Sequence, residues 1–132
     1  MSRTEFVPKG RYRVYLHRAE DFQSAMESAL QSENWNSVGL LAVHSTISAC
    51  DALCVAVLGQ KSTAQDHSEV RHLISSMNLP SSATTLKQIS DVLSVKNRVE
   101  YESREFTESE AREVRKKANR ILSWARDRLS NH

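Results

Sequence analysis

The stretch Trp35–Leu58 constrains the fold most, because it is long and apolar and contains no proline, lysine, arginine or glutamate. On a helix, a small residue at every third or fourth position lets neighbouring helices approach closely. Large apolar residues cover much of the remaining circumference, which is typical of a helix at the centre of a bundle. The stretch therefore predicts a central helix, with Asn34 or Asn36 as N-cap and Gly59 at its end. The small residues are Gly39, Ala42, Ser45, Ala49, Ala52 and Ala56.

A narrow line of polar residues interrupts this apolar helix. His44, Ser48 and Asp51 stand at positions i, i+4 and i+7 and so share one helix face, with Ser37 on the same side. One interpretation is a thin stripe that faces solvent. The other is a cleft or a dimer contact, because apolar residues flank the polar ones.

The rest of the chain predicts further helices around this one. A helical apolar period runs over residues 11–31, 66–77, 82–101 and 107–129. Asp66 and Ser81 or Ser82 are expected as N-caps. We expect residues 1–10 to form an irregular arm and residues 60–65 a polar loop, and no strand pattern competes. The expected fold is an all-α, up-down bundle of four to five helices, forming a single domain over residues 1–132.

The last helix has the clearest start signal in the sequence. Thr107 and Glu110 form a Thr-x-x-Glu capping box, and Phe106 and Ala111 are placed as a hydrophobic staple. Acidic residues occupy its first turns and basic residues its last turns, which complements the helix dipole.

Composition narrows the cellular setting and the chemistry. No run of 18 or more apolar residues exists, and the N-terminus lacks the apolar core of a signal peptide. We therefore expect a cytoplasmic protein with no membrane span. Cys50 and Cys54, one helical turn apart, are expected to be reduced core residues, and without further cysteines no Cys-rich zinc site can form. We expect no metal and no cofactor.

A local anomaly lies at the end of the fourth helix, in the segment KNRVEY (residues 96–101). Lys96 and Glu100 fall on the same helix face as Leu86, Ile89 and Leu93, and Arg98 points the other way. This opposite-charge couple is a buried ion pair, part of a polar site, or a solvated pair at a frayed helix end.

Three segments, in this order, resemble a HEPN domain (higher eukaryotes and prokaryotes nucleotide-binding). They are AVHSTISACDALCVAVLG, then GQKSTAQDHSEVRHLI, and then KNRVEY followed by a loop, the capping box and a helix ending in WARDRL. KNRVEY is similar to the Arg-Asn-x-Ala-Asp-Tyr signature of one HEPN branch, with Lys96 for its Arg and Glu100 for its Asp. The resemblance spans about residues 11–129.

This resemblance implies a bundle that acts as a homodimer. Many HEPN proteins are metal-independent ribonucleases, often toxins paired with an antitoxin, and their Arg-x4–6-His motif ends the penultimate helix. In that motif His moves protons and Arg holds the phosphate. Here Lys96 and Asn97 replace the Arg and the polar residue after it, and Tyr101 stands near the position of the His. Tyrosine is a poor proton shuttle at neutral pH, so we expect binding rather than catalysis at this segment.

The other candidate chemistries have weaker support. His44, His67 and Asp51 lack the spacing of helical metal ligands, and Ser48 with His44 lacks the oxyanion donors that acyl transfer needs. His67 lies at the expected start of a helix, where its side chain can accept a hydrogen bond from a free backbone N–H. Basic residues in the last third form either a nucleic-acid surface or, as the pattern favours, a solvated helix face interleaved with glutamate.

Two hypotheses follow for the function. The first is a homodimeric HEPN-like module that binds a nucleotide or RNA, in a toxin–antitoxin or defence setting with a nucleotidyltransferase-like partner protein. Its binding cleft would be lined by Lys96, Asn97, Glu100, Tyr101, His44, Ser48, Asp51 and His67. The second is a non-catalytic helical protein-interaction module that acts as a dimer.

Overall fold

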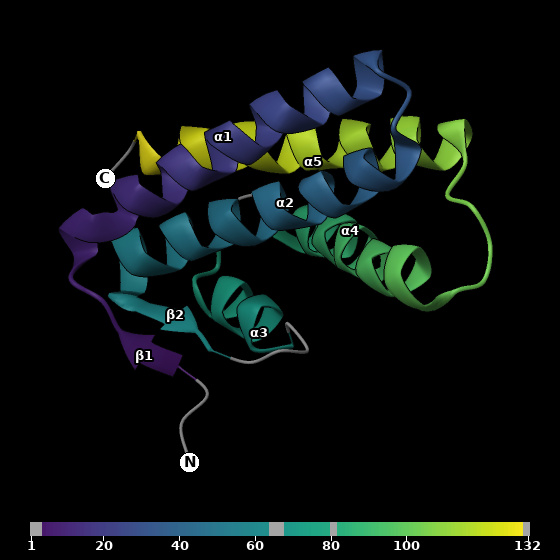
Figure 1. Ribbon diagram of the computed structural model, residues 1–132. Helices are drawn as coiled ribbons and strands as arrows, with labels where there is room; N and C mark the ends of the chain where they lie inside the picture. Colours follow the sequence, from purple (N-terminus) through teal and green to yellow (C-terminus); the bar gives the residue numbers. More distant parts are fainter. Residues whose placement is uncertain (1–3, 64–67, 80–81, 131–132) are drawn as a thin grey trace.

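The computed structural model describes residues 4–63, 68–79 and 82–130. In these residues the chain forms an all-α bundle of five helices with one short sheet, as Figure 1 shows. The expected fold class is thus confirmed, and the helix bounds agree with the predicted ranges to within a few residues. The helices are α1 (Tyr12–Gln31), α2 (Trp35–Leu58), α3 (Ser68–Ser76), α4 (Ser82–Tyr101) and α5 (Glu108–Leu129).

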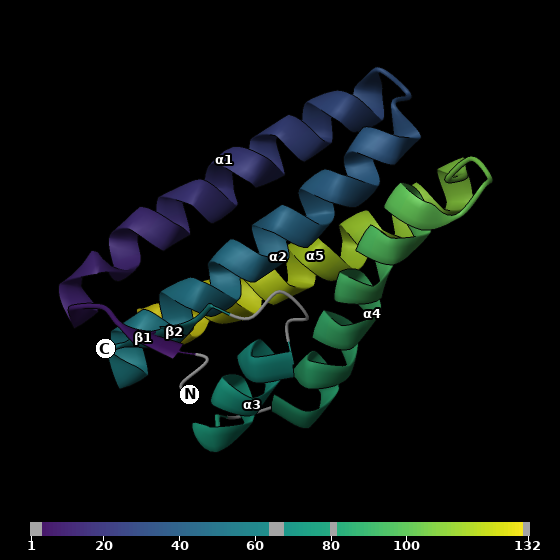
Figure 2. The same cartoon turned by 60° about the horizontal axis from the view of Figure 1, so that its bottom comes forward.

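Helix α2 lies at the centre, as its apolar circumference predicts. It packs against α1, α5, α4 and α3, and Figure 2 shows α1 beside it along most of its length. Ala42, Ala49 and Leu53 are fully buried, and Cys50 and Cys54 are buried free thiols. By length and composition alone α2 could also cross a membrane, but 67% of its apolar window is buried inside the bundle.

A small sheet replaces two segments that were expected to be irregular. Strand β1 (Thr4–Phe6) pairs antiparallel with β2 (Gln60–Ser62), in the register Glu5 opposite Lys61. A 3-10 turn, η1 (Lys9–Arg11), then leads into α1. The prediction of an irregular arm over residues 1–10 and of a polar loop over 60–65 was therefore wrong in part.

The pairing of the two strands depends on Gly59, which lies between α2 and β2. Gly59 ends α2 in the left-handed conformation (φ 67°) and directs the chain back toward its own N-terminus. The Val7 N–H then donates to the Gly59 carbonyl at 2.9 Å and aligns the two segments. Strands of three residues are too short to show an alternating pattern that could be recognised in the sequence.

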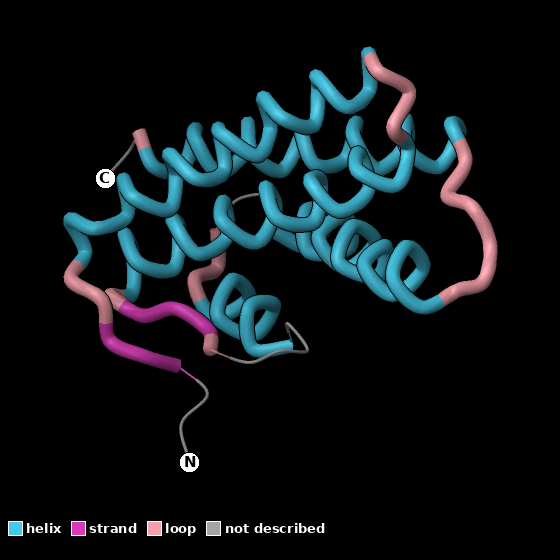
Figure 3. The backbone as a smooth tube through the Cα atoms, viewed as in Figure 1, coloured by secondary structure: helices cyan, strands magenta, loops and turns pink. Residues whose placement is uncertain are grey.

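The predicted start of α5 is confirmed in detail. Thr107 Oγ1 accepts from the Glu110 N–H at 3.1 Å, and Glu110 Oε1 accepts from the Thr107 N–H at 3.0 Å. Phe106, just before the cap, is buried. It fills the space above Gly39, where an added Cβ would lie 3.0 Å from the Phe106 ring. The capping box thus fixes where α5 leaves the loop that follows α4, drawn in Figure 3.

Two other predicted caps have different outcomes. Asn34 precedes α2, but its side chain makes no capping hydrogen bond. Asp66 and Ser81 lie outside the described residues, so their capping roles remain predictions.

Candidate functional site

The polar residues His44, Ser48 and Asp51 form a seam along α2 that runs from solvent into the bundle. His44 is exposed, and its ring centroid lies 5.5 Å from that of Phe22 on α1. One turn later Ser48 is only 7% exposed, and Asp51 is also only 7% exposed. A solvent-facing stripe therefore describes the His44 end of the seam and does not describe its Asp51 end.

Asp51 is the most unusual group on the seam. Its carboxylate has a pKa raised from 3.8 to about 6, because burial disfavours its charged form. The positive charges of Lys61 and Arg18 act in the opposite direction, and the negative charge of Glu5 adds a smaller rise. Asp51 is thus a buried acid that changes its charge close to neutral pH.

Three elements supply the charged groups around Asp51: β1, β2 and α1. Lys61, on β2, lies 3.5 Å from the Glu5 carboxylate on β1 and donates to the Ser62 carbonyl at 3.1 Å. Its Nζ also lies 6.0 Å from the centre of the Tyr15 ring on α1. The pairing of Glu5 with Lys61 in the sheet register is therefore what brings a lysine beside the buried end of the seam.

This arrangement can bind a polar ligand with both charged and hydroxyl groups. Arg18 and Lys61 offer positive charge, and the exposed His44 imidazole lies further along the same helix face. Asp51 can accept a hydrogen bond from a ligand hydroxyl when ionised and donate one when protonated.

The KNRVEY segment lies elsewhere on the fold. Val99 packs toward Gly39, so that an added Cβ at Gly39 would lie 3.0 Å from Val99 Cγ2. At 100° per residue, the seam residues point roughly 120–180° away from the direction of Gly39. Among the described residues no hydrogen bond or ion pair joins the seam to this segment, so the structure does not bring the two halves of the expected cleft into contact.

Within KNRVEY, the expected couple is not an ion pair. Lys96 is half-buried and Glu100 is exposed, and no salt bridge joins them in the described part of the chain. Asn97 is exposed, and Tyr101 is 75% exposed at the very end of α4. Because α4 continues to Tyr101, the end of the helix has not frayed at this couple.

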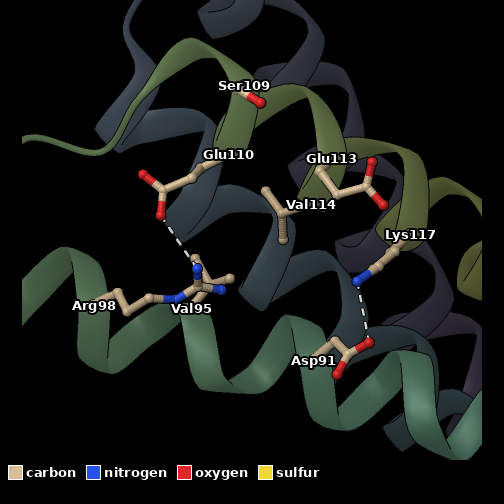
Figure 4. A pocket seen from close by; sticks show the side chains of 8 residues that line it. All are labelled: Asp91, Val95, Arg98, Ser109, Glu110, Glu113, Val114 and Lys117. Atoms are coloured by element: carbon tan, nitrogen blue, oxygen red, sulfur yellow. Dashed lines mark hydrogen bonds and ion pairs between the residues drawn. The ribbon is translucent and has the colours of Figure 1, made fainter.

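Arg98, which was predicted to point away from the face of Lys96 and Glu100, lines a groove between α4 and α5. Figure 4 shows this groove, whose volume is about 270 Å³. Arg98 lies 3.2 Å from Glu110, and Lys117 lies 3.1 Å from Asp91. The two ion pairs cross the groove from one helix to the other, so most of its charge is already neutralised within the protein.

Glu110 is the most strongly held acid of this groove. Arg104 donates to both of its carboxylate oxygens, at 2.8 and 2.9 Å, and lowers the pKa of Glu110 to about 2. The same carboxylate completes the α5 capping box. The ion pairs of Glu110 with Arg104 and Arg98 hold the α4–α5 loop in place. Because these charges are already paired within the protein, we assign this groove a structural role rather than a binding role.

Two further expectations concern His67 and metal binding. His67 lies outside the described residues, together with Asp66. Over residues 4–63, 68–79 and 82–130, no group of three or more His, Cys, Asp or Glu side chains is placed to hold a metal ion.

Sequence reasoning missed the partners of Asp51. Arg18 and Tyr15 read as ordinary residues of an amphipathic helix, and Lys61 and Glu5 fell in segments expected to be irregular. No local signal in the sequence could have found them, because only the β1–β2 pairing and the α1–α2 packing place them together.

Comparisons with known proteins add no assignment to this geometry. No protein-family model, no curated protein and no solved structure matches this chain. The function is therefore argued from the seam itself and from the motifs of the sequence.

Proposed function

We propose that the protein is a HEPN-like module that binds a nucleotide or RNA along the α2 seam, and that its ribonuclease motif is degenerate. The single observation that carries the proposal is the buried Asp51 carboxylate, with its pKa near 6, beside the charges of Lys61 and Arg18. Buried ionisable groups with strongly shifted pKa values concentrate at functional sites.

Three seam residues and two neighbouring cations have roles in this proposal. The guanidinium of Arg18 and the imidazole of His44 hold phosphate oxygens from the exposed side. Asp51 accepts a hydrogen bond from a ribose hydroxyl, as acidic residues do in other nucleotide sites. Lys61 balances the Asp51 charge, and Ser48 contributes a hydroxyl between the two ends of the seam.

The wider setting follows from the motif resemblance alone. It includes a homodimer, a toxin–antitoxin or defence role, and a nucleotidyltransferase-like partner protein. KNRVEY then serves as a dimer or partner contact, since Asn97, Glu100 and Tyr101 are exposed and do not touch the seam.

Thermal unfolding with added nucleotides tests the seam. Nucleoside mono- and triphosphates and a short single-stranded RNA are the probes, because a ligand that binds only the folded state raises Tm. We expect at least one probe to raise the Tm of the wild type, and Asp51→Asn or Arg18→Gln to abolish that shift.

The matched control is the double variant Lys96→Ala with Glu100→Ala. It removes one positive and one negative charge from α4 and should leave the nucleotide-induced shift intact. Loss of the shift in this control, but not in the seam variants, would move the site to KNRVEY. No shift with any probe would contradict the binding proposal.

The second hypothesis, a dimeric interaction module, is favoured by one observation. Tyr101 exposes 75% of its surface at the end of α4, where a large aromatic side chain contributes strongly to an interface. Sedimentation equilibrium of the wild type and of Tyr101→Ser tests it. We expect a wild-type dimer that the substitution weakens, and a monomeric wild type at high concentration would rule out the dimer.

A further inference from the structure

A surface pocket lies between β1 and the first turns of α1, and none of the seam residues His44, Ser48 and Asp51 lines it. Its volume is about 290 Å³, and Phe6, Pro8, Val14 and Tyr15 give it apolar walls. The Phe6 side chain is 80% exposed and that of Val14 is 41% exposed. Phe6 and Val14 are thus large apolar residues left uncovered side by side around a hollow, which is unusual for a surface with no partner.

The strand that forms one wall of this pocket has an open edge. β1 pairs with β2 on one side, and Figure 1 shows it as the outer strand of the two. The Val7 N–H donates to Gly59, and in an antiparallel pair the bonded residues alternate. The N–H and C=O of Phe6, one residue away from Val7, therefore point outward from the sheet. Another extended chain can pair with them.

The rim of the pocket is strongly basic. Arg11 and Arg18 line it directly. Neither side chain forms an ion pair within the described parts of the chain. The Arg18 guanidinium lies 5.1 Å from the centre of the Tyr15 ring, a cation–π contact that holds its positive charge beside the aromatic wall of the pocket.

The apolar pocket, the open strand edge and the basic rim distinguish between three possible occupants: a second copy of the chain, a nucleic acid and a peptide. A second copy of this chain would place Arg11 and Arg18 against the same cations, and like charges across an interface cost binding energy. A nucleic acid could pair its phosphates with the two arginines. It has no peptide backbone to hydrogen-bond to the strand edge and no apolar side chain to fill the pocket. An acidic extended peptide could pair its carboxylates with the arginines, hydrogen-bond its backbone to the strand edge and bury an apolar side chain in the pocket.

We propose that β1 and the first turns of α1 form a docking site for an acidic, extended segment of a partner protein. The segment adds a strand to the open edge of β1 and hydrogen-bonds to the Phe6 backbone. One of its apolar side chains enters the pocket beside Phe6 and Val14, and its flanking aspartates or glutamates meet Arg11 and Arg18. No seam residue of α2 lines this site, but its residues Arg18 and Tyr15 also lie close to the groups around Asp51.

Fluorescence polarisation with a labelled synthetic peptide tests the proposal on the full-length protein. The probe is a short peptide in which aspartate alternates with valine around a central leucine, and its partner probe carries lysine in place of aspartate. We expect the acidic peptide alone to bind, with an affinity that falls as salt is raised. Arg11→Glu should weaken it by about an order of magnitude or more, and Phe6→Ser should do so as well.

Two controls separate this site from the rest of the molecule. Arg120→Glu makes the same charge change on the exposed side of α5 and should bind the peptide like the wild type. Asp51→Asn should also keep peptide binding, so failure of the nucleotide proposal and failure of this one are distinguishable. The amide resonance of Phe6 should shift on titration, which reports pairing at the strand edge.

Three results would overturn the proposal. The first is an acidic peptide that does not bind, or that binds Arg11→Glu as well as the wild type. The second is single-stranded RNA that binds in a manner lost in Arg11→Glu and Phe6→Ser while the peptide does not, which would make the patch a nucleic-acid surface. The third is self-association of the wild type that Phe6→Ser abolishes, which would make a second copy the occupant.

Discussion

At the scale of single residues, a few polar groups are placed against their intrinsic preference. Asp51 lies 93% out of solvent near two cations and still has a raised pKa, so burial outweighs the attraction of those cations. Ser45, one turn from Ser48, avoids this cost because its hydroxyl donates to the Ala19 carbonyl at 2.9 Å. A side chain that costs stability without being needed for packing points to a role in binding.

The raised pKa of Asp51 predicts a specific pH dependence of stability. The folded protein holds this proton up to about pH 6, whereas the unfolded chain releases it near 3.8. Between these values the folded state binds more protons, so the free energy of unfolding falls as pH rises. The loss amounts to about 3 kcal/mol at most.

Urea unfolding from pH 3.5 to 7.5 measures this dependence. In Asp51→Asn the fall between about pH 4 and 6 should largely disappear, because the substituted side chain does not titrate. Glu100→Gln, which removes an exposed carboxylate on α4 that forms no ion pair among the described residues, should keep the wild-type profile. Identical profiles for the wild type and Asp51→Asn would show that this carboxylate is not held in a costly environment.

At the scale of elements, close approach at Gly39 sets how α2 meets the end of α4 and the start of α5. An added Cβ there would lie 3.0 Å from Val99 and 3.0 Å from Phe106, so the missing side chain is what the contact requires. Phe106 in turn is held by the capping box that begins α5. One glycine in the sequence therefore couples three helices.

Gly39→Val should destabilise the protein by about 1–3 kcal/mol, because it overpacks this contact. Shortening the opposing side chain should relieve the clash, so Phe106→Leu should cost less in the Gly39→Val background than in the wild type. Gly10, around which an added Cβ meets nothing within 4 Å, supplies the control substitution Gly10→Val. Additive costs for Gly39→Val and Phe106→Leu would contradict the close approach.

At the scale of the whole molecule, side chains far apart in the sequence join the first and last helices. Arg126 pairs with Glu20 at 2.8 Å, Arg115 pairs with Glu27 at 2.9 Å, and Gln23 donates to Asn119 at 2.8 Å. Each exposed pair contributes little alone. Together they set the register of α1 on α5 over the apolar core that α2 provides.

The central position of α2 predicts how its cysteines react. Burial raises the pKa of the Cys50 and Cys54 thiols, and the thiolate is the form that reacts with alkylating agents. We expect iodoacetamide to modify neither thiol in the folded protein and both together across the urea transition, measured by mass spectrometry. The exposed variant Ser24→Cys should react at once, and rapid labelling of Cys54 alone would reveal local opening at the end of α2.

The sequence by itself determined the helices, their approximate ends, the central place of α2, and the capping box at Thr107. These depend on local periodicity and local hydrogen bonds, which a single segment carries within itself. It also identified His44, Ser48 and Asp51 as one face of one helix. Only the tertiary structure decided that Lys61, Arg18 and Glu5 surround Asp51, and that KNRVEY packs elsewhere. Those facts depend on a sheet of two short strands and on helix packing, which join residues distant in the chain.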